Sequence, residues 1–336
     1  MTSRLVSVII VNWNGASYLQ SCLSSLSQQD YTQIEICIVD NASGDNSRQV
    51  VDAFCAHHHA MSIRWIQNAD NKGFCHGNNQ GIRQASGEFI LFLNADVTLH
   101  PEFIRLLVAV MQEDPSVGIA LGKLVNAGDH RLLDSTGIVI AKNRRAADRG
   151  QGEVDHGQYA SQEEVFGASG AACLCRRTML EEIKYPRTIC SSGEGDEYLD
   201  ELFFAYKEDV DLSWRARLFG WICVYSPAAI GQHARNWGAG KRRHIPEFVR
   251  HHSLKNRYLM LLKNERFDTL LPGIIHILWF ECLSAAYILF REPHLVSVVG
   301  TLIRMWPEVM RKRKMTHNRR SHRAAVTETL LPWFSN

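Results

Sequence analysis

Short apolar runs alternate with amphipathic stretches along the first hundred residues of the chain. The runs are residues 5–11, 34–39, 62–66 and 88–93, and the stretches between them, which suit helices, are residues 17–28, 46–59 and 76–85. Buried strands that alternate with helices form a largely parallel sheet covered on both faces. The pattern therefore predicts an α/β fold.

Polar residues stand where the predicted strands end. They are Asn12, Asp40, Asn68, Asn94 and Asp96. In open parallel sheets, ligands bind beyond the carboxyl ends of the strands. Since core packing does not require polar side chains at these positions, we expect them to line a ligand site.

Beyond residue 100 the pattern is less regular. Residues 101–113, 203–219 and 249–263 suit helices, whereas residues 122–164 are rich in glycine and charge and suit loops and short strands. The α/β pattern and these helices together predict one large domain over residues 1–263.

The last part of the chain changes character, which predicts a helical extension over residues 264–336. Residues 274–290 are almost wholly apolar except for Glu281 and two other polar residues, and residues 295–306 form a second apolar stretch. A spanning helix needs about 20 apolar residues, and a central Glu opposes a span. An apolar helix pair beside clustered Lys and Arg favours a peripheral position on an anionic membrane surface. The alternatives are a buried helical hairpin with a solvated tail and a true span.

Charge is distributed unevenly along the chain. Of its 336 residues, 46% are hydrophobic and 21% charged, as in a folded globular protein, and the net charge is +2. Seven basic residues near the C-terminus have no acid among them: Arg311, Lys312, Arg313, Lys314, Arg319, Arg320 and Arg323. Subtracting these seven charges from +2 leaves −5 for the rest. This balance argues against nucleic-acid binding by the body and indicates an anionic partner for the tail.

Cysteine usage and the N-terminus bear on location. The nine cysteines are scattered, and only Cys173 and Cys175 are close together, which predicts neither a zinc site nor a disulfide framework. Residues 1–4 lead into the first apolar run without the layout of a signal peptide. We expect reduced thiols and a cytoplasmic protein that lies on the inner face of the cell membrane.

Two of the polar strand ends carry carboxylates suited to a nucleotide and a metal. Asp40 could accept a hydrogen bond from a base N–H or a ribose hydroxyl, although its surroundings, residues 40–45, also suit a turn and helix cap. Asp96 offers a hard oxygen to Mg²⁺ or Mn²⁺, and one carboxylate suffices if a diphosphate supplies the other ligands. The alternative for residues 94–96 is a polar turn.

An acidic cluster and a histidine are further candidates. Glu208, Asp209 and Asp211 stand within four positions, where crowding raises the pKa of a carboxyl group toward that of a useful base. Acids in a first helical turn can equally be plain capping. His233 follows a strand-like run, and a loop histidine can complete a metal site, although a lone histidine is usually structural.

An ordered series of motifs carries a family resemblance. The segments are SVIIVNWN at 7–14, VDNAS at 39–43, the Asn- and Gly-rich run at 68–81, LNAD at 93–96, GASGA at 167–171, FFAYKEDVDL at 203–212, GW at 220–221 and His233. Together they resemble the family 2 inverting glycosyltransferases of GT-A fold, particularly the bacterial rhamnosyltransferase-like branch. The resemblance covers roughly residues 5–260.

The resemblance implies a binding site for a nucleotide-diphosphate sugar. Asp40 would hold the base, with Asn12 nearby, and the segment that contains Asn68, Lys72, Gly73 and Asn78 would frame the base, ribose and diphosphate. The Asn94-Ala95-Asp96 sequence matches the family's Asp-x-Asp motif, so Asp96 would ligate Mg²⁺ or Mn²⁺, with His233 as a second ligand. Asn94 replaces the first acid of that motif, which predicts weaker metal binding.

The resemblance also implies the catalytic and acceptor sides. Asp209 stands at the position of the catalytic base, flanked by Glu208 and Asp211, of which Asp211 could instead orient a neighbour or cap the helix. Gly167, Ser169 and Gly170 would shape the acceptor side. Lys207 departs from the family pattern, in which a less charged residue is expected.

The resulting hypothesis is an in-line displacement that moves a sugar, rhamnose by branch resemblance, to a lipid-linked saccharide during surface polysaccharide assembly. Two rival classes share the fold. A nucleotidyltransferase should carry a glycine-rich, lysine-containing phosphate loop after the first strand, and residues 12–15 have none. A non-catalytic nucleotide-sugar-binding or scaffold protein should lack the acids, yet Asp96, Asp209 and His233 are present.

Overall fold

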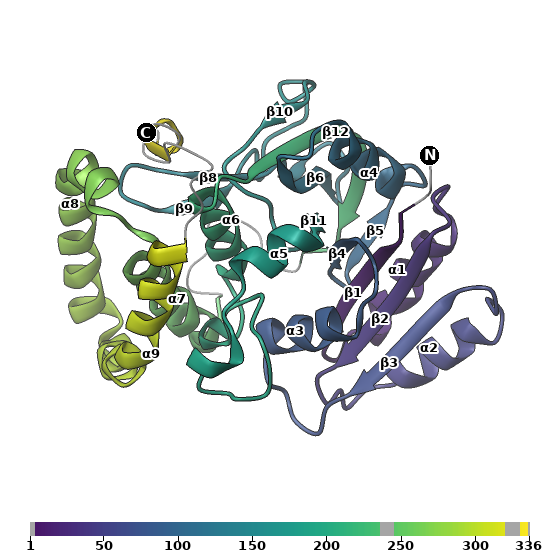
Figure 1. Ribbon diagram of the computed structural model, residues 1–336, viewed down its shortest axis with the longest axis horizontal. Coiled ribbons are helices and arrows are strands. Elements are labelled where there is room, and N and C mark those ends of the chain that lie inside the picture. Colours follow the sequence, from purple (N-terminus) through teal and green to yellow (C-terminus); the bar gives the residue numbers. More distant parts are fainter. Residues whose placement is uncertain (1–3, 236–244, 320–329, 335–336) are drawn as a thin grey trace.

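Residues 6–93 form four parallel strands separated by helices (Figure 1). The computed structural model describes residues 4–235, 245–319 and 330–334. The strands, β1 (Val6–Asn12), β2 (Ile34–Asp40), β3 (Ser62–Gln67) and β4 (Phe89–Leu93), pair in the order β3-β2-β1-β4. The helices between them are α1 (Ala16–Ser27), α2 (Ser47–Cys55) and α3 (Phe74–Gln84). Because all four strands are parallel, their carboxyl ends lie at one edge, as the sequence predicts.

Strands from residue 97 onward extend this sheet in both directions, and two of them, residues 138–140 and 146–148, form a separate antiparallel pair. The remaining strands are β5 (Val97–Leu99), β6 (Val117–Asn126), β7 (Leu133–Ser135), β8 (Ile138–Ile140), β9 (Ala146–Asp148), β10 (Glu163–Glu164), β11 (Ala172–Arg176) and β12 (Ile222–His233). β11 pairs antiparallel with both β4 and β6, and β12 is parallel to β6. β5 runs antiparallel to β12 and sets His233 opposite Val97. This register brings His233 next to Asp96, although the two are far apart in sequence.

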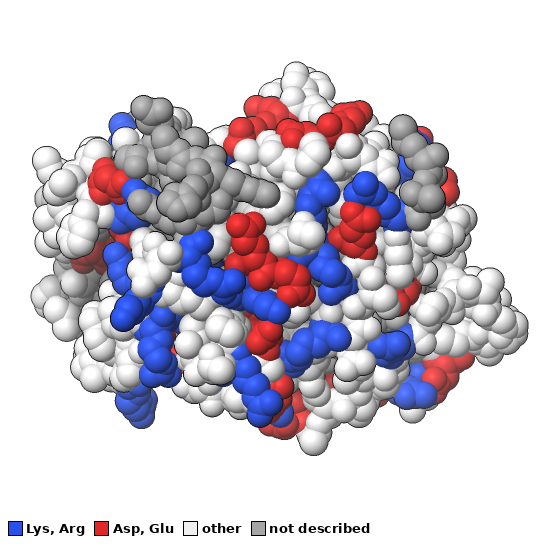
Figure 2. Space-filling model, in the orientation of Figure 1, with Lys and Arg blue, Asp and Glu red and all other residues white. Residues whose placement is uncertain are grey.

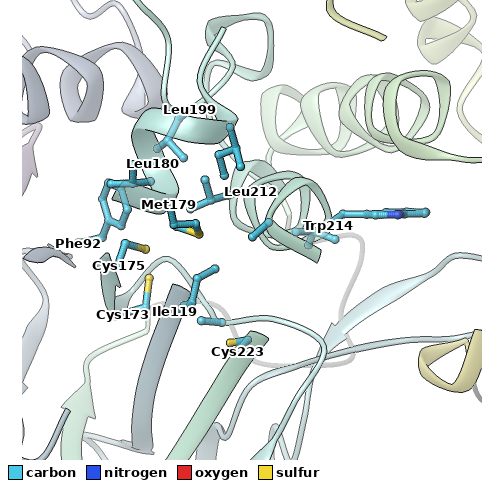
Figure 3. Close-up of a cluster of buried hydrophobic side chains, with 14 of the residues drawn as sticks. Phe92, Ile119, Cys173, Cys175, Met179, Leu180, Leu199, Leu212, Trp214 and Cys223 are labelled. Carbon is cyan, nitrogen blue, oxygen red and sulfur yellow. The ribbon is translucent and has the colours of Figure 1, made fainter. Parts of the chain in front are cut away.

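Side chains that alternate along β1 divide the core between the two faces of the sheet. Val8 and Ile10 pack with α1, α2 and α4 (Phe103–Glu113), whereas Ile9 packs into the cluster on the other face. Figure 3 shows part of this second cluster, in which side chains of the sheet meet those of α5 (Arg177–Ile183) and α6 (Glu208–Leu218). Trp214 of α6 is fully buried there. The core therefore fixes α6, the helix that begins with the acidic cluster.

Three helices follow the sheet: α7 (Glu247–Asn264), α8 (Phe267–Arg291) and α9 (Ser297–Arg319). Helix α7 packs against α6 and α9, while α8 lies at the outer edge of the molecule (Figure 1). Leu330 and Phe334, close to the C-terminus, belong to the same core cluster as Trp214. The C-terminal helices thus share buried contacts with the sheet-bearing part.

The basic tail is only partly available to an outside partner, which corrects the expectation from the sequence. Residues 311–319 continue α9, and Lys312 is fully buried between Glu197, Glu308 and Asp200, with its Nζ 2.7 Å, 2.7 Å and 2.8 Å from their carboxylate oxygens. Arg313 donates to Leu262 O, and Arg320 and Arg323 lie outside the described residues. A run of basic residues in the sequence does not reveal which face of a helix each side chain occupies. In α9 the side chain of Lys312 points into the interior of the protein.

A protein that lacks this buried ammonium group should be easier to unfold. We expect Lys312→Met to lower the free energy of unfolding by about 3–5 kcal/mol, because it leaves buried carboxylates without a counter-charge. Urea titration measures the change, with Lys314→Met, an exposed position on the same helix, as the control. Equal stabilities of the two variants would show that the buried ion pairs contribute nothing net.

Candidate active site

A buried carboxylate organises the ends of β1, β2 and β3. Asn12 Nδ2 donates to Asp40 Oδ2 at 2.7 Å, and Ser43 Oγ donates to the same oxygen at 2.6 Å. Asp40 Oδ1 accepts from Ser43 N and from Gln67 Nε2, both at 2.8 Å. A carboxylate has about four acceptor positions, and here all are used. A nucleotide base that binds Asp40 must therefore replace one of these donors.

A second amide network continues along the same edge. Asn68 Nδ2 donates to Asn41 Oδ1 and to Gln80 Oε1, both at 2.8 Å, and Asn41 Nδ2 donates to Gly73 O at 3.0 Å. Asn41 and Gln80 were not predicted as site residues, although each lies in a quoted motif. The network joins the end of β2 to the start of α3 and so places Asn68 and Gly73 beside Asp40.

The other two donor-side candidates make different contacts. Lys72 is exposed and pairs with Glu194 at 3.0 Å, so it lies where an anionic ligand could reach it. Asn78 is buried, and its Nδ2 donates to Phe74 O, one turn back in α3, at 3.0 Å. Asn78 therefore supports the helix in this structure.

Asp96 and His233 form a pair at the end of β4. Asp96 is partly exposed, and its Oδ1 lies 3.3 Å from His233 Nε2. Two backbone hydrogen bonds hold the turn at residues 94–96: Asn94 N donates to Ala171 O at 2.8 Å, and Ala234 N donates to Asp96 O at 2.9 Å. The two residues that the sequence predicted as metal ligands are thus brought together.

Behind His233 lies a row of alternating charges that the sequence did not reveal. His233 Nδ1 contacts Asp134 Oδ2 at 2.7 Å, Asp134 Oδ1 contacts Arg235 at 3.0 Å, and Arg235 contacts Asp148 at 3.0 Å. Burial opposes the charged imidazole, but the hydrogen bonds that it donates to Asp134 and Asp96 outweigh this effect and raise the pKa of His233 to about 9. Asp134 fixes the ring so that Nε2 faces Asp96.

These residues suit a divalent metal that a ligand helps to hold. Among residues 4–235, 245–319 and 330–334, no group of three or more His, Cys, Asp or Glu side chains gathers as a metal cage. A carboxylate oxygen is nevertheless a ligand that Mg²⁺ and Mn²⁺ sites use, and an imidazole nitrogen oriented by a second carboxylate is a common metal ligand in proteins. Asp96 and His233 fit a metal whose remaining ligands come from a diphosphate and water.

Asp209 lies at the start of α6, facing the small residues before β11. Its Oδ2 accepts a hydrogen bond from Gly170 N at 3.1 Å, and its side chain is partly exposed. Gly167 packs so closely on Ser213 that an added Cβ would lie 2.4 Å from that side chain. Ser169 is buried in the same segment. The predicted acceptor-side residues therefore line up against the helix that carries Asp209.

The two acids next to Asp209 differ from it and from each other. Burial, and then the charge of Asp209, raise the pKa of Glu208 to about 8, so Glu208 is mostly protonated at neutral pH. Asp211 is fully buried and contacts Arg215 at 2.9 Å, Lys263 at 2.9 Å and Asn264 at 2.8 Å. These contacts favour the structural alternative for Asp211, and Asp209 remains the partly exposed carboxylate of the three.

Charges converge where the two sides of the site meet. The charges of Asp148, Asp134 and Asp209 all act on Arg235. The edge of the sheet thus carries an amide network, a carboxylate–imidazole pair and a partly exposed carboxylate.

Comparison with known proteins identifies the family. The sequence model described as glycosyl transferase family 2 matches residues 7–184, more than half of the chain. The chain belongs to glycosyl transferase family 2. It is 22% identical over 236 residues to the poly-beta-1,6-N-acetyl-D-glucosamine synthase of Staphylococcus epidermidis, an alignment that covers 67% of this chain and 48% of that protein. The chain spans about half the length of the first curated relatives it matches.

Solved structures of other glycosyltransferases confirm the GT-A fold. Residues 1–349 of S. aureus TarS, in complex with UDP-GlcNAc, match with a TM-score of 0.57 and 17% identity over 98% of this chain and 90% of that one. The mannosyltransferase PcManGT of Pyrobaculum calidifontis, in complex with GDP-Man and Mn²⁺, matches with a TM-score of 0.52 and 15% identity over 100% and 89%. At these identities the likeness concerns the fold.

The raised pKa of His233 predicts how the metal-free protein responds to pH. Folding raises this pKa from 6.5 to about 9, so the imidazolium contributes stability that is fully present below pH 6.5 and lost as the pH rises through 9. The shift corresponds to roughly 3 kcal/mol. Asp134→Asn removes the main counter-charge, so the free energy of unfolding of this variant should fall less as the pH rises. Urea unfolding between pH 6 and 10 measures the difference. If both proteins lost the same amount of stability over this pH range, the loss would have to come from groups other than His233.

Proposed function

We propose that the protein is an inverting glycosyltransferase that moves a sugar from a nucleotide-diphosphate sugar to a saccharide acceptor. The observation that carries this proposal is that Arg235, which contacts Asp134 behind the Asp96–His233 pair, is also influenced by the charge of the partly exposed Asp209. Family membership supports it. The branch resemblance makes a deoxythymidine-diphosphate rhamnose donor the first to test, beside UDP sugars.

The edge of the sheet would bind the sugar donor. Asp40 and Asn68 would contact the base and ribose, with Lys72 close enough to the surface to meet the phosphates. Asp96 and His233 would hold Mg²⁺ or Mn²⁺ at the diphosphate, and the metal, when bound, would neutralise negative charge on the departing phosphates.

Asp209 would act as the general base. Its carboxylate would take the proton of an acceptor hydroxyl while the hydroxyl oxygen forms a bond to the anomeric carbon of the donor sugar. The bond between that carbon and the phosphate oxygen breaks on the opposite side, and the nucleoside diphosphate leaves with the electron pair. The configuration inverts because attack and departure lie on opposite faces. Gly170 N, bound to Asp209 Oδ2 at 3.1 Å, orients the carboxylate.

Substitution of the proposed base separates catalysis from binding. Asp209→Asn keeps the size and the hydrogen bond to Gly170 but cannot take a proton, so we expect transfer to fall by about 10²–10⁴-fold with donor affinity retained. Sugar transfer and calorimetric binding of the nucleotide measure the two effects. Glu208→Gln, which replaces a mostly neutral carboxyl group, serves as the comparison, and substantial turnover by Asp209→Asn would refute the assignment.

We propose further that α8 and α9 lie on an anionic membrane surface on the cytoplasmic side, where a lipid-linked acceptor would be found. Helix α8 is by length and composition apolar enough to cross a membrane, with a mean hydropathy of 1.7. Large apolar side chains of the two helices are exposed: Phe267, Leu271, Ile275, Leu278, Trp279, Leu283, Tyr287, Leu289, Phe290, Val296, Val299, Ile303 and Trp306. An exposed patch of this extent marks a protein or membrane contact.

Polar contacts of α8 favour a position along the surface over a span. Glu281 pairs with Arg257 at 2.7 Å and accepts from Tyr258 at 2.6 Å, so the middle of α8 is tied to α7. Exposed Arg304 and Lys314 on α9 offer positive charge to anionic headgroups. At the left edge of Figure 2, where α8 lies in Figure 1, uncharged side chains predominate, with a few acidic ones among them.

Flotation with liposomes tests this membrane role without removing buried segments. The triple variant Ile275→Glu, Trp279→Glu and Ile303→Glu should lose at least about a hundred-fold in binding to phosphatidylglycerol-containing vesicles, because burying each large apolar side chain contributes about 1.5–3 kcal/mol. The control, Val139→Glu with Val154→Glu, changes exposed apolar positions outside α8 and α9. Binding that is equal in both variants would refute the role of these helices.

A further inference from the structure

Three residues just before α6 have backbone conformations that side chains rarely adopt. Phe204, Tyr206 and Lys207 have φ of 66°, 73° and 66°. Such conformations cost of the order of 1–3 kcal/mol each and persist only where the surrounding structure holds them. At Phe204, ψ is −65° and Ala205 N donates to Phe203 O at 2.8 Å, which forms a γ-turn of the rare, strained kind.

Side chains of α7 hold this segment: His252 and Lys255 lie 3.3 Å and 3.5 Å from Phe203 O, and Asn256 makes the shortest contacts. Asn256 is fully buried, and its Nδ2 lies within hydrogen-bond distance of the carbonyl oxygens of Phe203, Ala205 and Tyr206, at 3.0 Å, 2.7 Å and 2.6 Å. The amide carries two hydrogens, so at least one is shared between carbonyls. Asn256 therefore satisfies backbone groups that the strained turn leaves outside helix and sheet hydrogen bonds.

The segment held by Asn256 touches both sides of the site. On the donor side, Phe204 O accepts from Cys75 N at 3.0 Å, and a Cβ on Gly73 would lie 2.6 Å from the Phe204 ring. On the catalytic side, Lys207 is the residue before α6, and Asp209 follows two residues later. Any change in the segment would move Asp209 relative to the donor side.

We propose that Asn256 is a positioning residue for Asp209, an inference that rests on the proposed function. Asn256 holds the carbonyls of the strained turn and thereby keeps the first turn of α6 where Asp209 faces Gly170. Without its amide, the segment relaxes toward negative φ and Asp209 shifts. A displacement of about 1 Å at a catalytic group can cost about 100-fold in rate, whereas the hydrogen bonds of Asp40 to Asn12, Ser43 and Gln67 do not involve this segment.

The kinetic test compares Asn256→Ala with Met260→Ala, a matched change one turn further along α7. Both side chains are buried, but Met260 belongs to the hydrophobic core. We expect both variants to melt at lower temperature and only Asn256→Ala to lose kcat, by about 100-fold, with KM for the nucleotide sugar little changed. Should Asn256→Ala not fold, Asn256→Ser, which keeps one donor, enters the same comparison.

Hydrogen exchange separates failure of this inference from failure of the proposed function. We expect the amides of residues 203–211 to exchange faster in Asn256→Ala than in Met260→Ala, with or without a substrate. Equal exchange of these amides in the two variants, or an equal kcat, would overturn the positioning role. Lack of transfer by the unaltered protein with every nucleotide sugar would count against the proposed function instead.

Discussion

The buried ion pairs of Asp211 are the interaction on which the arrangement of the site depends. Asp211 contacts Lys263 and Arg215, and Lys263 in turn contacts Asp200, which is also bound by Lys312. A buried charge is tolerated only where it is paired and hydrogen-bonded. The network therefore forces α6, α7 and α9 into one relative position. Asp209 lies on α6 two residues before Asp211. The position of this carboxylate, the proposed general base, therefore depends on the network.

A second constraint comes from the direction of the strands. Parallel pairing of β1, β2, β3 and β4 collects the polar residues that follow them, and the register of β12 against β5 adds His233 from the far end of the chain. Asp134, on β7, then orients the imidazole from behind. The Asp96–His233 pair and the amide network thus depend on the sheet, whereas the position of Asp209, the proposed general base, depends on the helices. The strained turn at residues 203–207 joins the two parts.

The sequence predicted the elements that local pattern determines. Buried apolar runs ending in Asn or Asp predicted the sheet and the edge at which its parallel strands end, and the ordered motifs identified the family and fold. Asp134 was missed because it stands in a weakly periodic region, and only strand pairing places it behind His233. Asp209 and Asp211 could not be separated by composition, since both belong to one acidic cluster, but residues two apart in a helix point to nearly opposite sides. Lys312 was assigned to a basic tail with an anionic partner for a similar reason: the direction of its side chain depends on how α9 packs.

The most direct test of the account is binding of the donor nucleotide to the metal pair. Melting temperature would be measured with UDP, dTDP, GDP and ADP, with and without Mn²⁺ or Mg²⁺, beside Asp96→Ala. A ligand at about 100 times its Kd stabilises the folded state by about 2.7 kcal/mol, which gives a clear shift. We expect at least one nucleoside diphosphate to raise the melting temperature in a metal-dependent way, and we expect Asp96→Ala to lose this shift. A shift that ignores the metal and persists in Asp96→Ala, or no shift with any nucleotide, would contradict it.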